Sequence, residues 1–422
     1  MKSTKILNKN SSLIFLLILL GFTILVTFTS EAFGSGFIST SFLKVLGKTL
    51  CLAIVAIAMD LVWGYTGILS LGHFAFFGLG GYMIGMWLMY ERTREIVQTS
   101  LSEATIPPTP DEVIDAIGNQ IFGVVGSSDF PIIWIFSNSL FMQLALVILV
   151  PCFLAFIFGW LAFRSRVTGV YLSILTQAMT LALALYLFQN DSGLRGNNGL
   201  SGLQNIPGMD KINQSFISIY FFWASACALA FFYLVADWLV SGKFGSVLKG
   251  IRDDESRIRF LGYPVENYKL FIFIFSAGIA GIAGALYYPQ AGIINPAELA
   301  PIASIYLAVW VAIGGRGKLY GAVIGAVFVS LVSSRFTSGQ IPDLNIGNYT
   351  IAWVDWWLVI LGITFVLVTI FTPKGLGGLV DLFHKGKITG RYDRDFGPEQ
   401  GSLRKKEASK SVSYTHLRAH ET

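Results

Sequence analysis

Charged residues are scarce in this sequence. Lysine, arginine, aspartate and glutamate make up 13% of the 422 residues, whereas apolar residues make up 54%. The charged share is about half of that in soluble proteins, which leaves too few charges to cover a soluble protein of this length. The net charge of +5 is also too small for a nucleic-acid-binding surface. The composition therefore excludes nucleic-acid-binding, disordered, coiled-coil and collagen-like proteins, and it favours a membrane protein.

Residue types that carry catalysis or hold metals are few as well. The three cysteines lie far apart in apolar segments, and the four histidines lack the spacing of zinc ligands. Gly47-Lys48-Thr49 resembles the end of a phosphate-binding Walker A loop, but Phe42 stands where its first glycine belongs. The sequence contains no nucleophile elbow, zinc-binding helix or catalytic carboxylate pair. We therefore expect no catalytic residues, no metal site and no cofactor bound by this chain.

The apolar residues form long runs that predict membrane-spanning helices, each of which needs about 20 mostly apolar residues. The fold class is therefore an all-α polytopic membrane bundle of about ten spans. We place these spans at residues 13–30, 43–63, 67–90, 138–163, 167–188, 214–240, 268–290, 300–314, 318–335 and 352–372. The eighth and ninth spans are short, so they are either two tilted helices or one broken helix. The first run resembles a signal peptide, but its length and the lack of a clear cleavage site favour an uncleaved helix.

Lysine and arginine between the spans predict the orientation, because they collect in cytoplasmic loops. With the N-terminus inside, most of them fall on the cytoplasmic side, and the outside loop 91–137 is acidic. Lys44 and Lys48, near the outer end of the second span, are an exception. We expect a multi-pass bacterial inner-membrane protein with both termini in the cytoplasm. Residues 1–384 then form the membrane domain, and residues 385–422 form a polar tail whose last dozen residues look unrelated to the rest.

Acidic side chains are nearly absent from the middles of the predicted spans. Asp60, Asp237 and Asp355 fall near span ends. An ion-driven carrier usually exposes carboxylates at the middle of the membrane, so we expect the energy source to lie outside this chain. Glycines recur at short spacings within the third, seventh and ninth spans, which predicts helices that pack closely.

Residues 63–73 join two predicted spans without any charged residue and are rich in glycine, serine and threonine. This composition predicts irregular backbone, which is tolerated at membrane depth only inside protein or beside a water-filled cavity. The segment is either a packing turn or part of a translocation path. A second loop, 190–202, carries amides that could bind a small polar solute, although a solvated loop or a docking surface for an external protein fits equally well. The candidate path residues are Tyr65, Thr66, Ser70, His73, Asn197 and Asn198.

The longest inside loop, 241–269, predicts a short amphipathic helix, because Phe244, Val247, Leu248 and Ile251 recur at helical spacing. Acidic and basic residues follow closely, and a Gly-Tyr-Pro stretch ends the element. Such a helix is too charged for a membrane anchor and suits the groove of a soluble partner. The alternative is a solvated loop with weak local ion pairs. The candidate docking residues are Gly250, Ile251, Arg252, Asp253, Asp254, Glu255, Ser256 and Arg257.

Five segments together resemble the membrane subunits of branched-chain amino acid and urea type ABC transporters. They are DLVWGYTGILSLGHFAFFGLGGY from Asp60, RVTGVYLSILTQAM from Arg166, NNGLSG from Asn197, LKGIRDDESRIRFLGY from Leu248 and GGRGKLYGAVIGA from Gly314. They cover residues 60–326. Within this family the first and fourth segments look most like the larger permease of urea transporters. The acidic insert 91–137 and the tail depart from the resemblance.

This resemblance implies a permease subunit of an ATP-driven importer, not an enzyme, that forms the path for a small polar solute. Urea is the preferred solute, and a branched-chain amino acid or a short-chain amide is the alternative; an autonomous secondary transporter or channel fits less well. The implied partners are a second homologous permease, two cytoplasmic ATPases that bind the ATP, an external solute-binding protein and the lipid membrane. The resemblance also implies that the loop around 250–262 holds the coupling helix that sits on an ATPase.

Overall fold

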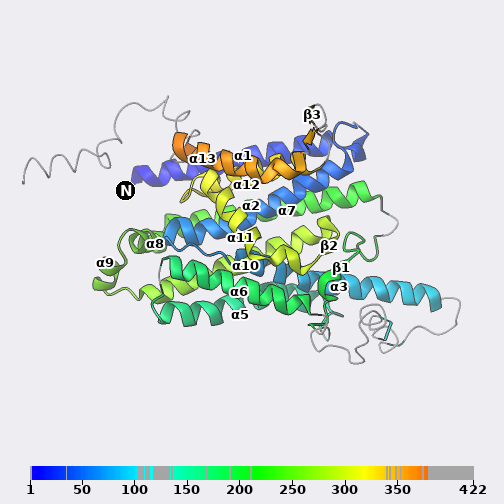
Figure 1. Ribbon diagram of the computed structural model, residues 1–422, viewed down its shortest axis with the longest axis horizontal. Coiled ribbons are helices and arrows are strands. Elements are labelled where there is room, and N and C mark those ends of the chain that lie inside the picture. Colours follow the sequence, from blue (N-terminus) through cyan, green and yellow to red (C-terminus); the bar gives the residue numbers. More distant parts are fainter. Residues whose placement is uncertain are drawn as a thin grey trace, which may run out of the picture. The chain divides into compact units, whose positions relative to one another are not determined.

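The computed structural model describes residues 2–34, 36–101, 109, 115–116, 134, 136–167, 169–189, 192–209, 212–338, 341, 344–346, 349–351, 353–372 and 375–378. This part is a bundle of helices with two short two-stranded β-ladders (Figure 1). Its helices belong to one compact unit that ends at Gly378. The predicted tail 385–422 and most of the predicted acidic insert 91–137 lie outside the described residues.

Each of the predicted spans corresponds to a helix, so the all-α polytopic fold class is confirmed. In chain order the helices are α1 (Lys2–Phe28), α2 (Thr40–Thr66), α3 (His73–Leu101), α5 (Leu140–Arg164), α6 (Val170–Phe188), α7 (Gln214–Ser241), α10 (Val265–Ala291), α11 (Pro301–Gly314), α12 (Leu319–Thr337) and α13 (Trp353–Phe371). Within the described ranges, 6 helices are long and apolar enough to cross a membrane. Shorter apolar helices occur at Ser12–Phe28, Pro301–Gly314 and Trp353–Val368.

Short elements mark the two ends of the bundle. One end carries α8 (Lys243–Asp253) and α9 (Glu255–Phe260), and we call it the α8 end (Figure 1, left). Near the other end, the β1 end, β1 (Leu200–Ser201) pairs antiparallel with β2 (Ile293–Ile294), with Leu200 opposite Ile294. The 3-10 helices η4 (Gly196–Asn198) and η5 (Pro296–Leu299) flank this ladder, and η1 (Glu31–Phe33) follows α1. The strands β3 (Leu344–Ile346) and β4 (Tyr349–Ile351) form a second ladder.

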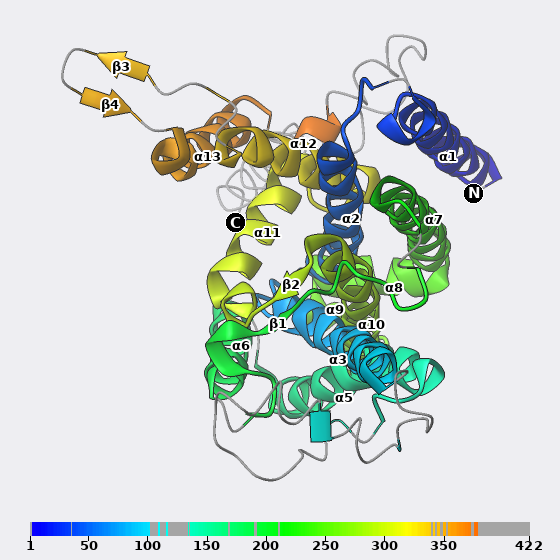
Figure 2. The same ribbon diagram turned by 90° about the vertical axis from the view of Figure 1, so that its right-hand side faces the viewer.

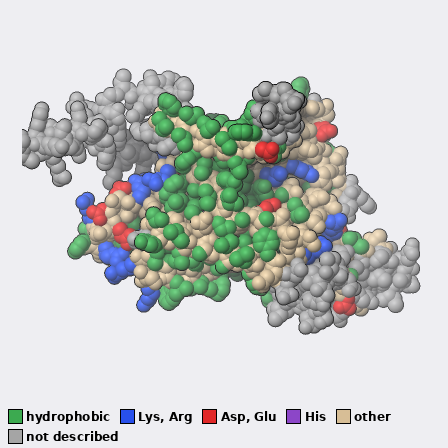
Figure 3. Space-filling model, viewed as in Figure 1, with side chains coloured by type: hydrophobic (Ala, Val, Ile, Leu, Met, Phe, Trp, Pro, Cys, Tyr) green, Lys and Arg blue, Asp and Glu red, His purple; other side chains and the backbone are tan. Residues whose placement is uncertain are grey.

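Helix α2 lies at the centre of the bundle, surrounded by α7, α10, α11 and α12 (Figure 2). In its most apolar stretch 89% of the residues are buried, compared with 22% in α5. Peripheral helices instead expose large apolar side chains such as Phe153 and Trp238, whose exposed fractions are 64% and 76%. Exposed apolar surface of this extent is expected where helices face lipid (Figure 3).

Glycines bring α3 and α10 into backbone contact. A side chain on Gly80 would place its Cβ 2.6 Å from the Cα of Gly281, and one on Gly284 would meet the backbone of Phe77. Gly81 lies under the ring of Tyr288. The predicted close packing of the glycine-rich helices is therefore what the structure has, because only a missing Cβ allows this approach.

The start of α3 differs from the prediction, and the structure decides between the two alternatives for the eighth and ninth spans. Helix α3 begins at His73 rather than at residue 67, because the segment Gly67–Gly72 is not helical, as its composition predicted. The eighth and ninth spans are two separate helices joined by a turn at 315–318. Helix α11 has 14 residues and is therefore only about 21 Å long, shorter than the roughly 30 Å of a bilayer core.

Candidate functional site

Helix α8 forms where the spacing of apolar residues predicted it, but its apolar face is turned inward. Leu248 and Ile251 are buried, and α8 packs against α7 and α2. Phe244 stacks on Tyr268 of α10, with ring centroids 5.3 Å apart. These apolar residues therefore anchor α8 to its own bundle, and they are not available to hold a partner protein.

The outward-facing part of this loop is α9. The carboxylate of Asp254 caps α9 by accepting a hydrogen bond from the Arg257 amide at 3.1 Å. Arg257 projects outward, with 78% of its side chain exposed. At the other end of α9, Phe260 and Leu261 are 91% and 67% exposed. This apolar pair was not among the predicted docking residues, although two apolar residues just before Gly262 in a charged loop could have indicated it.

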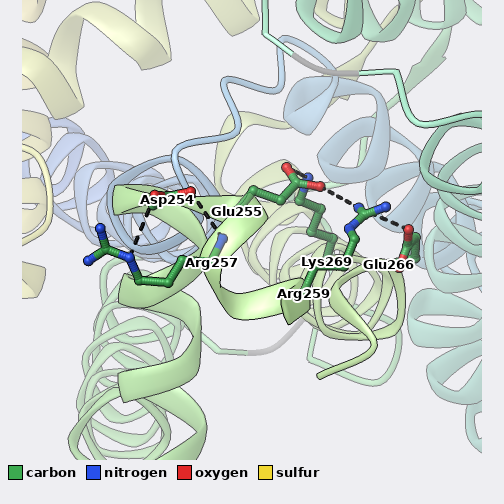
Figure 4. Close-up of polar contacts among 6 residues, drawn as sticks. All are labelled: Asp254, Glu255, Arg257, Arg259, Glu266 and Lys269. Carbon is green, nitrogen blue, oxygen red and sulfur yellow. Dashed lines mark hydrogen bonds and ion pairs between the residues drawn. The ribbon is translucent and has the colours of Figure 1, made fainter. Parts of the chain in front are cut away.

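A chain of ion pairs attaches α9 to the start of α10 (Figure 4). Glu255 binds Arg259 at 2.8 Å and Lys269 at 2.5 Å. Arg259 also binds Glu266 of α10 at 3.0 Å. Lys269 is buried, so removal of Glu255 would leave its charge uncompensated, which is strongly unfavourable. The network therefore makes α9 and the base of α10 one connected piece.

The α8 end also joins three parts of the chain that are far apart in sequence. The Nη1 of Arg252 donates a hydrogen bond to the carbonyl oxygen of Gly64, near the end of α2, at 2.8 Å. Asp60, one turn earlier on α2, accepts a hydrogen bond from the amide of Gly317 at 2.8 Å. Gly317 lies in the turn between α11 and α12. A displacement of α8 would therefore move α2 through the Arg252 hydrogen bond. The Asp60 hydrogen bond would pass this movement from α2 to the α11–α12 turn.

The predicted docking residues thus lie together on α8 and α9, but their exposure differs. Ile251 is buried, and Gly250 and Glu255 are half-buried. The remaining candidates are exposed, and they are Arg252, Asp253, Asp254, Ser256 and Arg257. Arg259, Glu266, Lys269 and Phe260 extend the site beyond the predicted set.

The non-helical segment Gly67–Gly72 returns into the bundle. The imidazole of His73, at its end, lies against the backbone of Ala58. Because Ala58 lies eight residues before the end of α2, the segment climbs about 12 Å back from that end. Hydroxyl groups of α6 satisfy its backbone, since Ser173 donates to the carbonyl oxygen of Leu69 at 2.7 Å and Thr176 accepts from the Leu71 amide at 3.0 Å. The irregular backbone is thus stabilised inside protein, as membrane depth requires.

The six predicted path residues do not converge. Tyr65, Thr66, Ser70 and His73 are buried around this segment. Thr66 bonds to the carbonyl oxygen of Val62 in its own helix, and the ring of Tyr65 lies under the ammonium group of Lys249. Asn197 and Asn198 are instead exposed in η4, next to η5 and toward the β1 end.

Comparisons with known proteins agree on one family. Residues 41–369 match the family described as branched-chain amino acid transport system, permease component. The branched-chain amino acid permease LivM of Salmonella typhimurium is 23% identical over 80% of this chain and 70% of its own length. LivM of Escherichia coli is 23% identical over 78% of this chain and 68% of its own length. A probable branched-chain amino acid permease, LivH, of Methanocaldococcus jannaschii is 28% identical over 45% of this chain and 60% of its own length.

No solved structure matches the chain at a significant level. The expected preference for urea receives no support from these relatives, whose names fit the alternative, a branched-chain amino acid permease. The relatives are permease proteins rather than enzymes, as the resemblance implied. Since the family match covers most of the sequence, this chain belongs to the permease components of branched-chain amino acid transport systems, which makes it a multi-pass inner-membrane subunit of an ABC transporter.

Proposed function

We propose that this chain is one of two homologous permeases in an ATP-driven importer of a branched-chain amino acid. The proposed complex also contains two cytoplasmic ATPases, which bind the ATP, and an external solute-binding protein. The family match and the LivM relatives support the transport function and favour an amino acid over urea. The α8 end then faces the cytoplasm together with both termini, in keeping with its cluster of lysines and arginines.

The observation that supports coupling best is the link from α8 to the bundle through Arg252. An ATPase that pulls on α9 would move α10 through the Glu255 ion pairs and α2 through the bond from Arg252 to Gly64. Because α2 is central, this movement would shift the helices around it. The exposed residues Arg257 and Phe260 are the ones we assign to direct contact with the ATPase, since charge fixes register and a buried aromatic anchors an interface.

The test is uptake into liposomes by the whole complex, with Arg257→Glu and Phe260→Ala as variants. Both residues are mostly exposed, so we expect normal insertion and stability but at least a tenfold loss of ATP-dependent uptake of labelled leucine, because ATPase contact is lost. Arg94→Glu, in the last part of α3, and Phe37→Ala, just before α2, are the matched controls, since both residues are exposed and these ends of α3 and α2 lie opposite α9 (Figure 1). Undiminished uptake by both variants would refute the coupling role. Uptake of urea in place of leucine would refute the proposed substrate.

A further inference from the structure

Two connecting segments, each with one short 3-10 helix and one short strand, meet between α3 and α6. Residues 292–300 lead from α10 into α11, and residues 192–205 follow α6; β1 and β2 join them, and the Leu203 amide bonds to the carbonyl oxygen of Gly292 at 3.0 Å. They pack along the first half of α3, where Gly78 contacts Leu299 and Gly85 contacts Leu200. Where such irregular backbone enters a membrane domain, it is tolerated only inside protein or beside a water-filled cavity.

Opposite charges face this region. Glu298, on η5, is half-buried, and the hydroxyl of Tyr288 lies beside its carboxylate. Lys48, on α2, lies about 12 Å inside the start of that helix at Thr40 and is half-buried. Glu298 is the opposite charge that acts on Lys48. Ionisable residues inside a membrane domain are rare, and their default interpretation is a functional site.

The two charges do not touch. Lys48 forms no ion pair within 4.0 Å and no hydrogen bond with any residue that the structure describes. Two neighbouring polar atoms are also buried without a described partner, namely the hydroxyl of Tyr82, on which Glu298 acts, and the Oδ1 of Asn295, three residues before Glu298. A pair kept only for stability would be expected in direct contact, with its remaining polar groups satisfied. A polar guest between the two charges would instead give both of them, and the unpaired atoms, a partner.

The surroundings favour a guest that carries both charges. Arg335 of α12 covers the ring of Phe42, near the β1 end of α2, at 5.3 Å. A carboxylate entering from that end would be attracted to Lys48, and an ammonium group to Glu298. Urea carries neither charge.

We propose that Lys48 and Glu298 form a head-group clasp, in which Lys48 binds the carboxylate and Glu298 the ammonium group of an amino acid crossing the membrane. This inference rests on the proposed function, because it assumes that the solute is an amino acid. The clasp recognises only the main-chain groups shared by all amino acids, so choice among side chains is left to the apolar residues around it and to the external binding protein.

The experiment compares Lys48→Met, Glu298→Gln and the double variant in the reconstituted complex, with the binding protein saturated with leucine. Each single variant is expected to lower uptake at least tenfold, and the double variant is expected to be no better, while ATP hydrolysis stimulated by loaded binding protein stays within twofold of the unmodified rate. Lys44→Met, one turn away on α2, is the matched control and should transport within twofold of normal. Co-purification of the partner subunits reports correct assembly.

The double variant lacks both charges, so neither is left uncompensated. Its uptake can therefore test the clasp even if a single variant fails to assemble. Uptake restored in the double variant would show mere charge compensation and overturn the clasp. Normal import by both single variants would overturn the clasp alone. An unmodified complex that assembles and hydrolyses ATP but imports no amino acid would instead overturn the proposed function, and the clasp with it.

Discussion

The carboxylate of Asp60 is fully buried at the α8 end, where its Oδ1 accepts the Gly317 amide and its Oδ2 has no hydrogen-bond partner among the described groups. The backbones of α2 and the α11–α12 turn are in close contact beside Asp60, because a Cβ on Gly64 would lie 2.6 Å from the Gly317 nitrogen. One side chain thus fixes the spacing between α2 and the α11–α12 turn.

Replacement of Asp60 by alanine should destabilise this junction. The partly buried Gly317 amide would be left without an acceptor in the protein, which costs at most about 1–3 kcal/mol. Asp60→Asn keeps an acceptor oxygen at nearly the same place and is the matched control. We expect the melting temperature of the purified complex to fall clearly for Asp60→Ala and much less for Asp60→Asn. Equal melting temperatures for the two variants would contradict the role assigned to the hydrogen bond.

At this scale the sequence predicted positions better than partners. It placed Asp60 near the end of a span, and the structure has Asp60 in the last two turns of α2. It could not pair Asp60 with Gly317 or Lys48 with Glu298, because residues about 250 positions apart leave no periodic signal. The sequence does not single out Glu298, which falls between two predicted spans, because nothing in its neighbours indicates that the chain folds back into the bundle.

At the scale of secondary-structure elements, the contact between α3 and α10 depends on glycines, which have no side chain. Gly80→Ala would force a Cβ against the backbone of Gly281, which no rotamer change can relieve. We expect the two helices to separate locally and the complex to lose about 1–3 kcal/mol of stability, as in other overpacked interiors. Gly362→Ala in α13, where a Cβ would meet nothing within 4 Å, is the control. Thermal unfolding followed by size-exclusion chromatography would measure both, and an equally stable Gly80→Ala would disprove the close contact.

Apolar runs predicted the helices themselves well, because burial in lipid or protein needs about 20 apolar residues whatever the tertiary structure. They predicted the start of α3 poorly. Residues 67–72 are as apolar as a helix, and only the hydroxyl groups supplied by α6 allow them to stay irregular. The surface that buries the apolar face of α8 could not be predicted either. An amphipathic pattern shows that one face of a helix is buried, but it does not show whether that face packs on its own chain or on a partner.

At the scale of the whole molecule, we expect this chain to transport no solute without its partner subunits. The sequence contains no nucleotide-binding loop, and the contacts of α8 and α9 are suited to transmit movement rather than to generate it. We expect the purified chain in liposomes to neither hydrolyse ATP nor accumulate leucine against a gradient, whereas the complete complex does both. Accumulation by the lone chain, driven by an ion gradient, would point to a secondary transporter and contradict the proposal.

The membrane topology and the family could be inferred from sequence, because composition and several separate segments agree on them. The solute could not. The resemblance that favours urea lies in two segments, and neither of these includes Lys48 or Glu298, the residues proposed to bind the two charged groups of an amino acid.

The shortness of α11 has a consequence for the resting protein. Since this helix covers only about 21 Å, a short stretch of peptide around Asn295 has to seal the rest of the membrane thickness beside it. Because the protein must not leak protons or sodium, this short stretch has to stay closed to small ions whenever no solute passes. Substitutions that disrupt the stretch around Asn295 should therefore make the protein leak small ions.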